Sequence, residues 1–399
     1  MTTLPTAAEQ NSAYFFYCFH FFIFMIKIKE NLLLYTLLIF IFGFFCGGYF
    51  FNLGYPGTQE LSLIKEVENI IEEKFLFPNG KPENLKNELI YGAASGMVRE
   101  LNDPYSSFFD PKERMEFEEL ISGEYEGIGT EIGMKDKKCI IIAPLKNSPA
   151  EKVGIKAGDE ILEVDETPVE GLDLSEIVKK IKGKAGTKVK LKIKRDEKIF
   201  EIEIQREKIV IPSIELEVLP QEVAHFKIYH FLDNATSQFE SAMKIILGTK
   251  IQKIILDLRN NSGGSLNEAV NIASYFLPKG QVILKEEGRD GKINEITSKG
   301  PGTFATYKIV VLINKGTASA AEILAGALKE NLKVKLVGEK TFGKGTVQEF
   351  ISLKDGSAIK LTTSRWLLPS GTPVEGKRLK PDIEASDEEI LNKALSILK

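Results

Sequence analysis

Hydrophobic residues recur at helical spacing downstream of residue 56. In LSLIKEVENIIEE, residues 61–73, leucine, isoleucine and valine return every third or fourth position, and acidic side chains occupy the opposite face. This period is typical of an amphipathic helix. Residues 84–101 and 111–122 predict two further helices. We therefore expect a helical segment over residues 57–123.

The pattern changes to strict alternation further along the chain. KVKLKIK (188–194) and FEIEIQ (200–205) place an apolar residue at every second position, which predicts strands with one solvated face. A short amphipathic helix is expected before them, over residues 174–181. A compact domain of short strands with one or two helices therefore fits residues 124–207.

Continuous apolar runs follow Pro212. IQKIILDL (251–258) and KIVVLIN (308–314) are each followed by a turn and a helical pattern. Such alternation of strand and helix predicts βαβ units around a buried, partly parallel sheet. We expect a mixed α/β core over residues 208–385 and a terminal helix within residues 386–399.

A long apolar run precedes these domains. Residues 32–51 (LLLYTLLIFIFGFFCGGYFF) carry no charge, and about 20 such residues span a bilayer as a helix. We expect a single transmembrane anchor over residues 31–52 rather than a cleaved signal peptide, since the sequence after it offers a poor cleavage site. Lys27 and Lys29 place residues 1–30 in the cytoplasm and the rest of the chain on the periplasmic or extracytoplasmic side of the inner membrane. A start at Met25 is the alternative for the aromatic first residues.

Composition narrows the chemistry. The 399 residues include 52 Lys+Arg against 56 Asp+Glu, a net charge of −4, so no basic surplus points to nucleic acid. Three cysteines and three histidines predict neither a disulfide framework nor a zinc site, and we expect no metal and no cofactor. His225 and His230 are five apart in a predicted strand, face opposite sides, and are expected to be structural.

Two turns have residues suited to catalysis. Ser319 lies where the strand over 308–314 gives way to a helix, close to unsatisfied backbone N–H groups that suit an oxyanion. An ordinary helix N-cap is the alternative. Lys344 lies between two glycines with apolar neighbours, and burial lowers the pKa of an amine so that it can act as a base. An exposed loop lysine is the alternative for Lys344. Gln348, four residues on, could orient the amine by a hydrogen bond; an ordinary exposed polar residue is the alternative for Gln348.

A glycine turn follows the strand over 251–258. Gly263 and Gly264 either donate a backbone N–H to an oxyanion or simply form the turn. Because no histidine is well placed as a base, a serine nucleophile here would need lysine, a known variant of the catalytic triad.

Together these motifs resemble the carboxyl-terminal processing proteases, the tail-specific serine peptidase family S41, from about residue 60 to the end. The motifs DLRNNSGG (257–264), TASAAE (317–322) and TFGKGTVQ (341–348) occur along the chain in the order expected for the family. Ser262 stands where the family usually has proline. Arg378 replaces a usual glycine, which we expect to be tolerated.

The resemblance implies a role for each candidate. Ser319 would be the nucleophile, Lys344 the general base and Gln348 its orienting partner. The oxyanion hole would be formed by the backbone N–H of Ala320 and of one glycine, with Gly263 and Gly264 both open.

Residues 124–207 resemble a PDZ domain through GIGTEI, SPAEKVGIKAGDEILEVD and GTKVKLKIKR. PDZ domains bind a C-terminal peptide by strand addition and hold its carboxylate with backbone N–H groups. The residues expected to bind the substrate tail are Tyr125, Gly127, Ile128, Gly129 and Lys182.

The expected protein is a membrane-anchored serine endopeptidase with a Ser–Lys dyad that cleaves protein substrates near or from their C-terminal tails. A protease that rests inactive until a partner activates it is one alternative. A non-catalytic PDZ receptor or adapter is another. The resemblance leaves open a homodimer and an activator protein.

Overall fold

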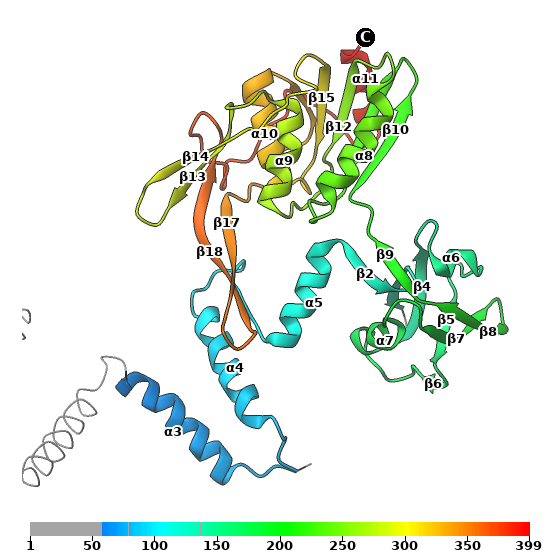
Figure 1. Ribbon diagram of the computed structural model, residues 1–399, viewed down its shortest axis with the longest axis vertical. Coiled ribbons are helices and arrows are strands. Elements are labelled where there is room, and N and C mark those ends of the chain that lie inside the picture. The colour runs from blue at the N-terminus through cyan, green and yellow to red at the C-terminus, as the bar shows by residue number, and fades with distance from the viewer. Residues whose placement is uncertain (1–57, 79, 136) are drawn as a thin grey trace, which may run out of the picture. The chain divides into compact units, whose positions relative to one another are not determined.

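Figure 1 shows the computed structural model, which describes residues 58–78, 80–135 and 137–399. The expected cytoplasmic tail and the expected anchor over residues 31–52 lie outside these ranges. Among the described residues, no helix is long and apolar enough to cross a membrane. The chain divides into two units, one that ends at Ala93 and one that begins at Ala94.

The predicted helices after residue 57 are present. Helix α3 covers Thr58–Lys74, and α4 covers Leu85–Arg99 and crosses the boundary between the units. Helix α5 (Pro111–Ser122) begins at Asp110, whose carboxylate accepts the N–H groups of Lys112 and Glu113, as an N-cap residue should.

This segment is not purely helical as expected, because Ser107–Phe109 forms a strand, β1. Strand β1 pairs with β18 (Ala358–Leu367), far away in the sequence. The Phe109 ring stacks on Phe117, with ring centroids 4.9 Å apart. Three residues that pair with a distant strand have no local period, so the helical pattern around them masked the strand.

A strand-rich domain follows. Its sheet has the order β3-β4-β5-β7-β8, with β6 paired to β5, and two short helices accompany it. The predicted alternation is confirmed in β7, where Val189, Leu191 and Ile193 are fully buried. The elements are β3 (Thr130–Lys135), β4 (Lys138–Pro144), α6 (Pro149–Lys152), β5 (Glu160–Val164), β6 (Thr167–Pro168), α7 (Leu174–Ile181), β7 (Lys188–Arg195) and β8 (Lys198–Gln205). A separate ribbon pairs β2 (Glu124–Gly127) with β9 (Glu207–Val210).

The α/β core is built on a six-stranded sheet of order β10-β11-β12-β15-β16-β19. Its β10 edge is antiparallel, and the other pairs are parallel. Its strands are β10 (Ile214–Leu219), β11 (Val223–Ile228), β12 (Lys253–Asp257), β15 (Lys308–Ile313), β16 (Lys335–Gly338) and β19 (Ile383–Glu384). Its helices are α8 (Ala235–Leu247), α9 (Leu266–Phe276), α10 (Ala320–Leu332) and α11 (Ile390–Ile397).

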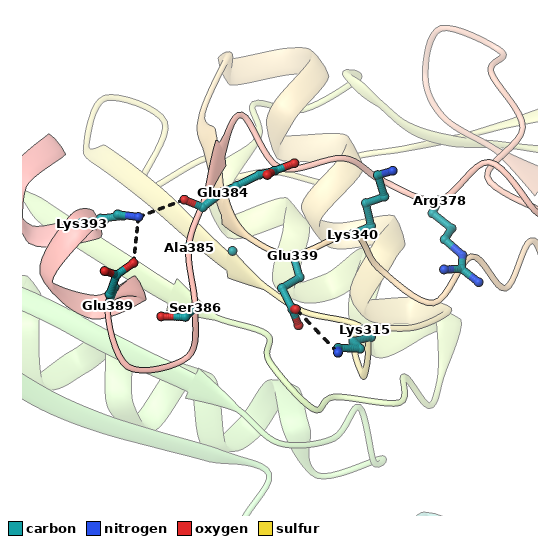
Figure 2. Close-up of a pocket in the computed structure, with 10 residues that line it drawn as sticks. Lys315, Glu339, Lys340, Arg378, Glu384, Ala385, Ser386, Glu389 and Lys393 are labelled. Atoms are coloured by element: carbon teal, nitrogen blue, oxygen red, sulfur yellow. Dashed lines mark hydrogen bonds and ion pairs between the residues drawn. The ribbon is translucent and has the colours of Figure 1, made fainter.

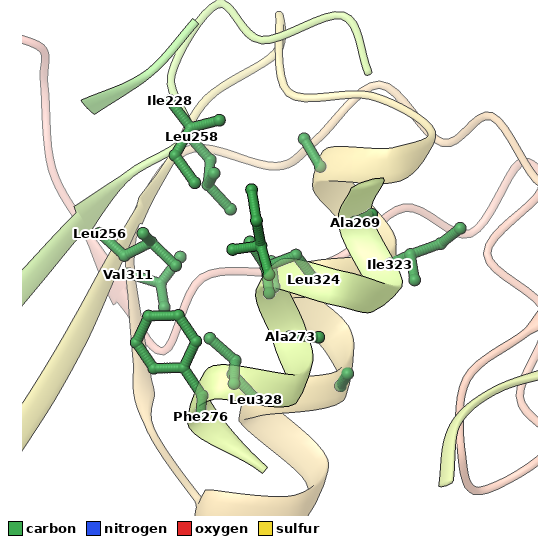
Figure 3. Close-up of a cluster of buried hydrophobic side chains, with 14 of the residues drawn as sticks. Ile228, Leu256, Leu258, Ala269, Ala273, Phe276, Val311, Ile323, Leu324 and Leu328 are labelled. Carbon is green, nitrogen blue, oxygen red and sulfur yellow. The ribbon is translucent and has the colours of Figure 1, made fainter. Parts of the chain in front are cut away.

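Side chains pack on both faces of this sheet. Figure 3 shows one face, where Leu256 and Val311 of the strands lie with Ala273 of α9 and Leu324 of α10. The other face packs against α11. Burial on both faces explains why the central strands are continuous apolar runs. With the strand directions given above, it confirms the predicted buried, partly parallel sheet.

A second, antiparallel sheet has the order β1-β18-β13-β14, with β17 also paired to β18. Its remaining strands are β13 (Val282–Gly288), β14 (Ile293–Thr297) and β17 (Thr346–Ser352). In Figure 1, β17 and β18 form a long hairpin. The loop that carries Lys344 leads directly into β17, so this sheet positions the predicted base.

Candidate active site

Ser319 lies immediately before α10, at the end of the turn that follows β15. The turn is tied down by Thr317, whose hydroxyl accepts the Asn314 N–H at 3.0 Å and donates to the Leu258 carbonyl at 2.8 Å. Ser319 has φ 53° and ψ −119°, whereas an ordinary N-cap residue has an extended backbone. Such strained backbone at a non-glycine residue is concentrated at functional sites, which favours the nucleophile over the N-cap interpretation.

The carboxylate of Glu322 joins the serine turn to the lysine loop. Oε2 accepts the N–H groups of Ser319 at 2.9 Å and of Lys344 at 3.0 Å. Oε1 accepts the Gly343 N–H at 2.9 Å and the Thr341 hydroxyl. Glu322 is fully buried, and burial raises its pKa although all these hydrogen bonds oppose the shift.

Sequence reasoning missed this role of Glu322. The residue appeared only as the last letter of TASAAE. Its spacing was a usable signal, because a glutamate three residues after a serine at a helix start is placed to accept that serine's backbone N–H. The same carboxylate also reaches Lys344, which no local pattern could reveal.

Lys344 and Gln348 meet as expected. The Lys344 amine donates to Gln348 Oε1 at 2.8 Å. The Gln348 amide donates to the hydroxyls of Thr346 and Thr362, each at 3.0 Å, so its oxygen is fixed toward the amine. Among the described residues, the Lys344 amine donates a hydrogen bond to Gln348, and no hydrogen bond connects the amine to the Ser319 hydroxyl.

The environment of Lys344 differs from that of a free surface lysine. The side chain is half-buried, and burial lowers its pKa, helped by the positive charge of Lys360 and opposed by Asp103 and Glu375. The Trp366 indole N–H donates to the Lys344 carbonyl at 2.9 Å, which fixes the backbone beneath the amine. A lowered pKa increases the fraction of neutral amine available to take a proton.

The glycine turn lies directly against the serine turn. A Cβ on Gly263 would come within 2.9 Å of the Ser319 Cβ and 3.1 Å of the Ala320 nitrogen. The Gly263 N–H itself donates to Asn261 Oδ1 at 2.8 Å. No hydrogen bond is recorded for the N–H groups of Ala320 and Gly264 within the described part of the chain. These two groups therefore remain available to an oxyanion.

The predicted tail-binding residues also lie together. Tyr125, Gly127, Ile128, Gly129 and Lys182 line one small cavity of about 80 Å³, together with side chains of β3 and α7. The Lys182 amine lies 4.9 Å from the centroid of the Tyr125 ring. It also donates to the carboxylate of Glu119 on α5 at 2.6 Å, a partner that the sequence did not indicate.

A larger cavity of about 610 Å³ lies at the carboxyl ends of β15 and β16 (Figure 2) and contains none of the predicted catalytic residues. Much of its charge is internally paired, with Lys315 3.7 Å from Glu339 and Lys393 3.0 Å from Glu389. Arg378 also lines it and has φ 61°, a left-handed backbone that explains why glycine is usual at this position.

His225 and His230 take no part in the contacts described above for Ser319, Lys344 and Gln348. His225 on β11 lies 3.3 Å from Asp257 Oδ2. Burial acts to raise the pKa of Asp257, but hydrogen bonds from His225 and Arg259 outweigh it and hold the pKa at about 2. His230 lies beyond the end of β11 at Ile228, so the regular strand assumed for the pair stops before it. In the described ranges, no group of three or more His, Cys, Asp or Glu side chains is placed to hold a metal ion.

Comparison with known proteins agrees with these motifs. Residues 222–385 match peptidase family S41, and residues 119–194 match the PDZ domain. The chain is 41% identical over 296 residues to a "Probable CtpA-like serine protease" of Staphylococcus haemolyticus, covering 74% of this chain and 60% of that protein. It is 38% identical over 300 residues to "Carboxy-terminal processing protease CtpA" of Bacillus subtilis, covering 75% of this chain and 64% of the relative.

The chain thus spans about three-fifths of the length of these relatives. Among solved structures, the photosystem II D1 C-terminal processing protease aligns with a TM-score of 0.50 and 24% identity, covering 86% of this chain and 98% of that one. That structure supports the fold. The two family matches and the similarity to the relatives place this chain in peptidase family S41, with a PDZ domain over residues 119–194.

Proposed function

We propose that this protein is a membrane-anchored serine endopeptidase that cleaves protein substrates near or from their C-terminal tails, with Ser319 as nucleophile and Lys344 as base. The observation that carries the proposal is the Glu322 carboxylate, which binds the backbone of both residues. One buried group thereby sets the separation of the serine turn and the lysine loop.

The hydrogen bond from Lys344 to Gln348 suits a neutral amine. A neutral amine that donates one N–H to Gln348 Oε1 is oriented with its lone pair free to accept the Ser319 hydroxyl proton. Ser319 Oγ attacks the scissile carbonyl, and Lys344 then returns the proton to the leaving amine. Water hydrolyses the acyl-enzyme with Lys344 again as base.

We assign the oxyanion hole to the N–H groups of Ala320 and Gly264. The Gly263 N–H donates to Asn261, whereas among the described residues no hydrogen bond engages the N–H groups of Ala320 and Gly264. Two preorganised donors aimed at the developing oxyanion stabilise the tetrahedral intermediate more than the substrate carbonyl. No metal or cofactor takes part in the proposed mechanism.

The small cavity of the PDZ domain is the proposed site for the substrate tail. A peptide would add to the domain as a strand, with its carboxylate at the backbone N–H groups near Ile128 and Gly129 and its charge opposite Lys182. In the structure Lys182 forms an ion pair with Glu119, so the carboxylate of a substrate tail would compete with Glu119 for the Lys182 amine. This pair is an observation in favour of the alternative that the protease rests inactive until a tail or partner protein binds.

The membrane part of the proposal rests on residues 31–52 of the sequence. An uncleaved helix there would hold the catalytic unit on the extracytoplasmic side of the inner membrane. Labelling of cysteines introduced after residue 57 with a membrane-impermeant reagent in intact cells tests the side. Labelling only after cell lysis would contradict it.

The decisive experiment uses the full chain in detergent and an unfolded reporter protein with either an apolar or a charged C-terminal tail. The parent should cleave one reporter faster, and Ser319→Ala and Lys344→Met should cleave neither while retaining binding to the tail. Equal cleavage by Ser319→Ala would refute the catalytic assignment. Tail binding without cleavage by any version, even with candidate activators, would favour the adapter.

A further inference from the structure

The amine of Lys344 has a second neighbour besides Gln348. It lies 4.3 Å from the centroid of the Tyr105 ring. Tyr105 comes from the turn between α4 and β1, far from Lys344 in the sequence but in the same unit. A cation within about 6 Å of an aromatic centroid is attracted to the ring face.

The turn that carries Tyr105 is held in place by hydrogen bonds. The carboxylate of Asp103 accepts the Tyr105 N–H at 3.1 Å and the Ser106 hydroxyl at 2.6 Å. The Ser106 oxygen in turn accepts the Thr362 N–H at 3.0 Å. The turn is thus anchored to β18.

Strand β18 also leads back to the base. The Thr362 hydroxyl accepts a hydrogen bond from the amide of Gln348, whose oxygen accepts the Lys344 amine. The contacts form a closed ring of Tyr105, Asp103, Ser106, Thr362, Gln348 and Lys344. Both neighbours of the amine therefore depend on the same strand.

We propose that Tyr105 is a positioning residue for the base, whose ring face holds the Lys344 amine against Gln348 and shields it from water. The inference rests on the proposed function, since it gives Lys344 the role of base. The hydroxyl of Tyr105 is not needed for this role, because the contact is made by the ring.

Charged groups from every neighbouring segment act on the same amine. They are Lys360 on β18, Asp103 in the anchored turn and Glu375 in the loop after β18. Glu322 of α10 lies nearby and accepts the backbone N–H of Lys344. These groups remain in a Tyr105 variant, so a change in the titration of Lys344 reports the ring.

The test compares Tyr105→Leu with Tyr105→Phe in the full chain. Leucine keeps apolar cover but loses the attraction of the ring for the protonated amine. The acid limb of the pH profile of kcat/KM should then move down by about 0.4 to 1.5 pH units, with a lower kcat. Phenylalanine keeps the ring and should restore the limb of the parent.

A matched control is Tyr229→Leu, because the Tyr229 ring lies 4.7 Å from the Lys227 amine on the β10–β11 edge. It should leave the acid limb in place. Thermal unfolding of each variant verifies folding. An unshifted limb in Tyr105→Leu, or an equal shift in Tyr105→Phe, would overturn the inference.

A second readout does not need activity. In a Ser319→Ala background, the pH dependence of Lys344 acetylation by acetic anhydride, followed by mass spectrometry, gives the titration midpoint of the amine directly. A lower midpoint in Tyr105→Leu and an unchanged one in Tyr105→Phe support the ring contact, even if the parent's cleavage proves independent of Lys344. Identical midpoints in all three overturn it, even if cleavage requires both Ser319 and Lys344.

Discussion

The buried carboxylate of Glu322 offers the sharpest test of how the site is held together. Each of its oxygens accepts two hydrogen bonds, Oε2 from Ser319 and Lys344 and Oε1 from Gly343 and Thr341. Glu322→Gln keeps the shape but replaces one oxygen by an NH₂ group that cannot accept. The amide should turn this group toward Thr341, whose hydroxyl can reverse and accept, so that one backbone N–H loses its partner.

The magnitude follows from that count. One buried N–H left unpaired costs about 1 to 3 kcal/mol. We expect Glu322→Gln to lower the free energy of unfolding by about that amount. If the same free energy is lost from the transition state, kcat should fall about 5- to 150-fold, because 1.4 kcal/mol corresponds to a factor of ten. KM should change little, since Glu322 does not contact the tail cavity. Glu322→Ala leaves all four donors unpaired and should lose both folding stability and activity more severely.

The assay is steady-state cleavage of a tailed reporter, together with urea unfolding monitored by circular dichroism. Glu330→Gln is the matched control, because Glu330 lies on the same helix and its carboxylate accepts hydrogen bonds from the exposed Ser370. It should retain the parent's kcat. If Glu322→Ala kept kcat within twofold of the parent, the carboxylate would not set the geometry of Ser319 and Lys344.

Three further outcomes are expected. Glu119→Gln should free Lys182 and tighten binding of a tail peptide by about two- to fivefold in fluorescence anisotropy titrations, as suits a half-exposed ion pair. A peptide with an amidated C-terminus should show no gain, and a gain for both peptides would disprove that Glu119 competes with the peptide carboxylate for Lys182. The pKa of Lys344 is lowered in the folded state, so between the folded pKa and 10.5 the unfolded chain binds more protons than the folded one. The free energy of unfolding of the parent should therefore rise with pH across that window relative to that of Lys344→Met. If denaturant unfolding gave the same pH dependence for both proteins, the shift would be contradicted. Gly264→Ala places a Cβ against the carbonyl oxygen of Phe231 at φ 137°, and it should cost about 2 kcal/mol or more of unfolding free energy. Gly248→Ala, with open space around the added Cβ, should be nearly neutral in the same unfolding measurement.

Local periodicity predicted most of the fold. The alternation in 188–194 became β7 with its apolar side chains buried, and the apolar runs over 251–258 and 308–314 became parallel neighbours. In each case the signal lies within a single element, since burial of one or both faces imposes a period on adjacent residues. Strand β1 was missed because its partner lies on a distant part of the chain.

Sequence motifs predicted which residues form most of the candidate site, but not all of their contacts. Lys344 and Gln348 are four residues apart, and their hydrogen bond follows from that spacing and the start of β17. Glu322 was within a recognised motif, but its contact with the lysine loop was not predictable. The proposed assignment of the oxyanion donor to Gly264 rather than Gly263 also needed coordinates, because it rests on the hydrogen bond between the Gly263 N–H and Asn261.

The sequence by itself therefore determined most of the elements, their order along the chain and the residue types available for catalysis, because these depend on neighbours along the backbone. Tertiary structure alone decided what surrounds Lys344. Tyr105 contacts the Lys344 amine, Glu322 accepts the Lys344 backbone N–H, and Thr362 holds Gln348, the partner of the amine; the three come from separate segments. The physical reason is that burial, hydrogen bonding and the pKa of an amine depend on distances through space, and sheet pairing brings together residues that share no local pattern.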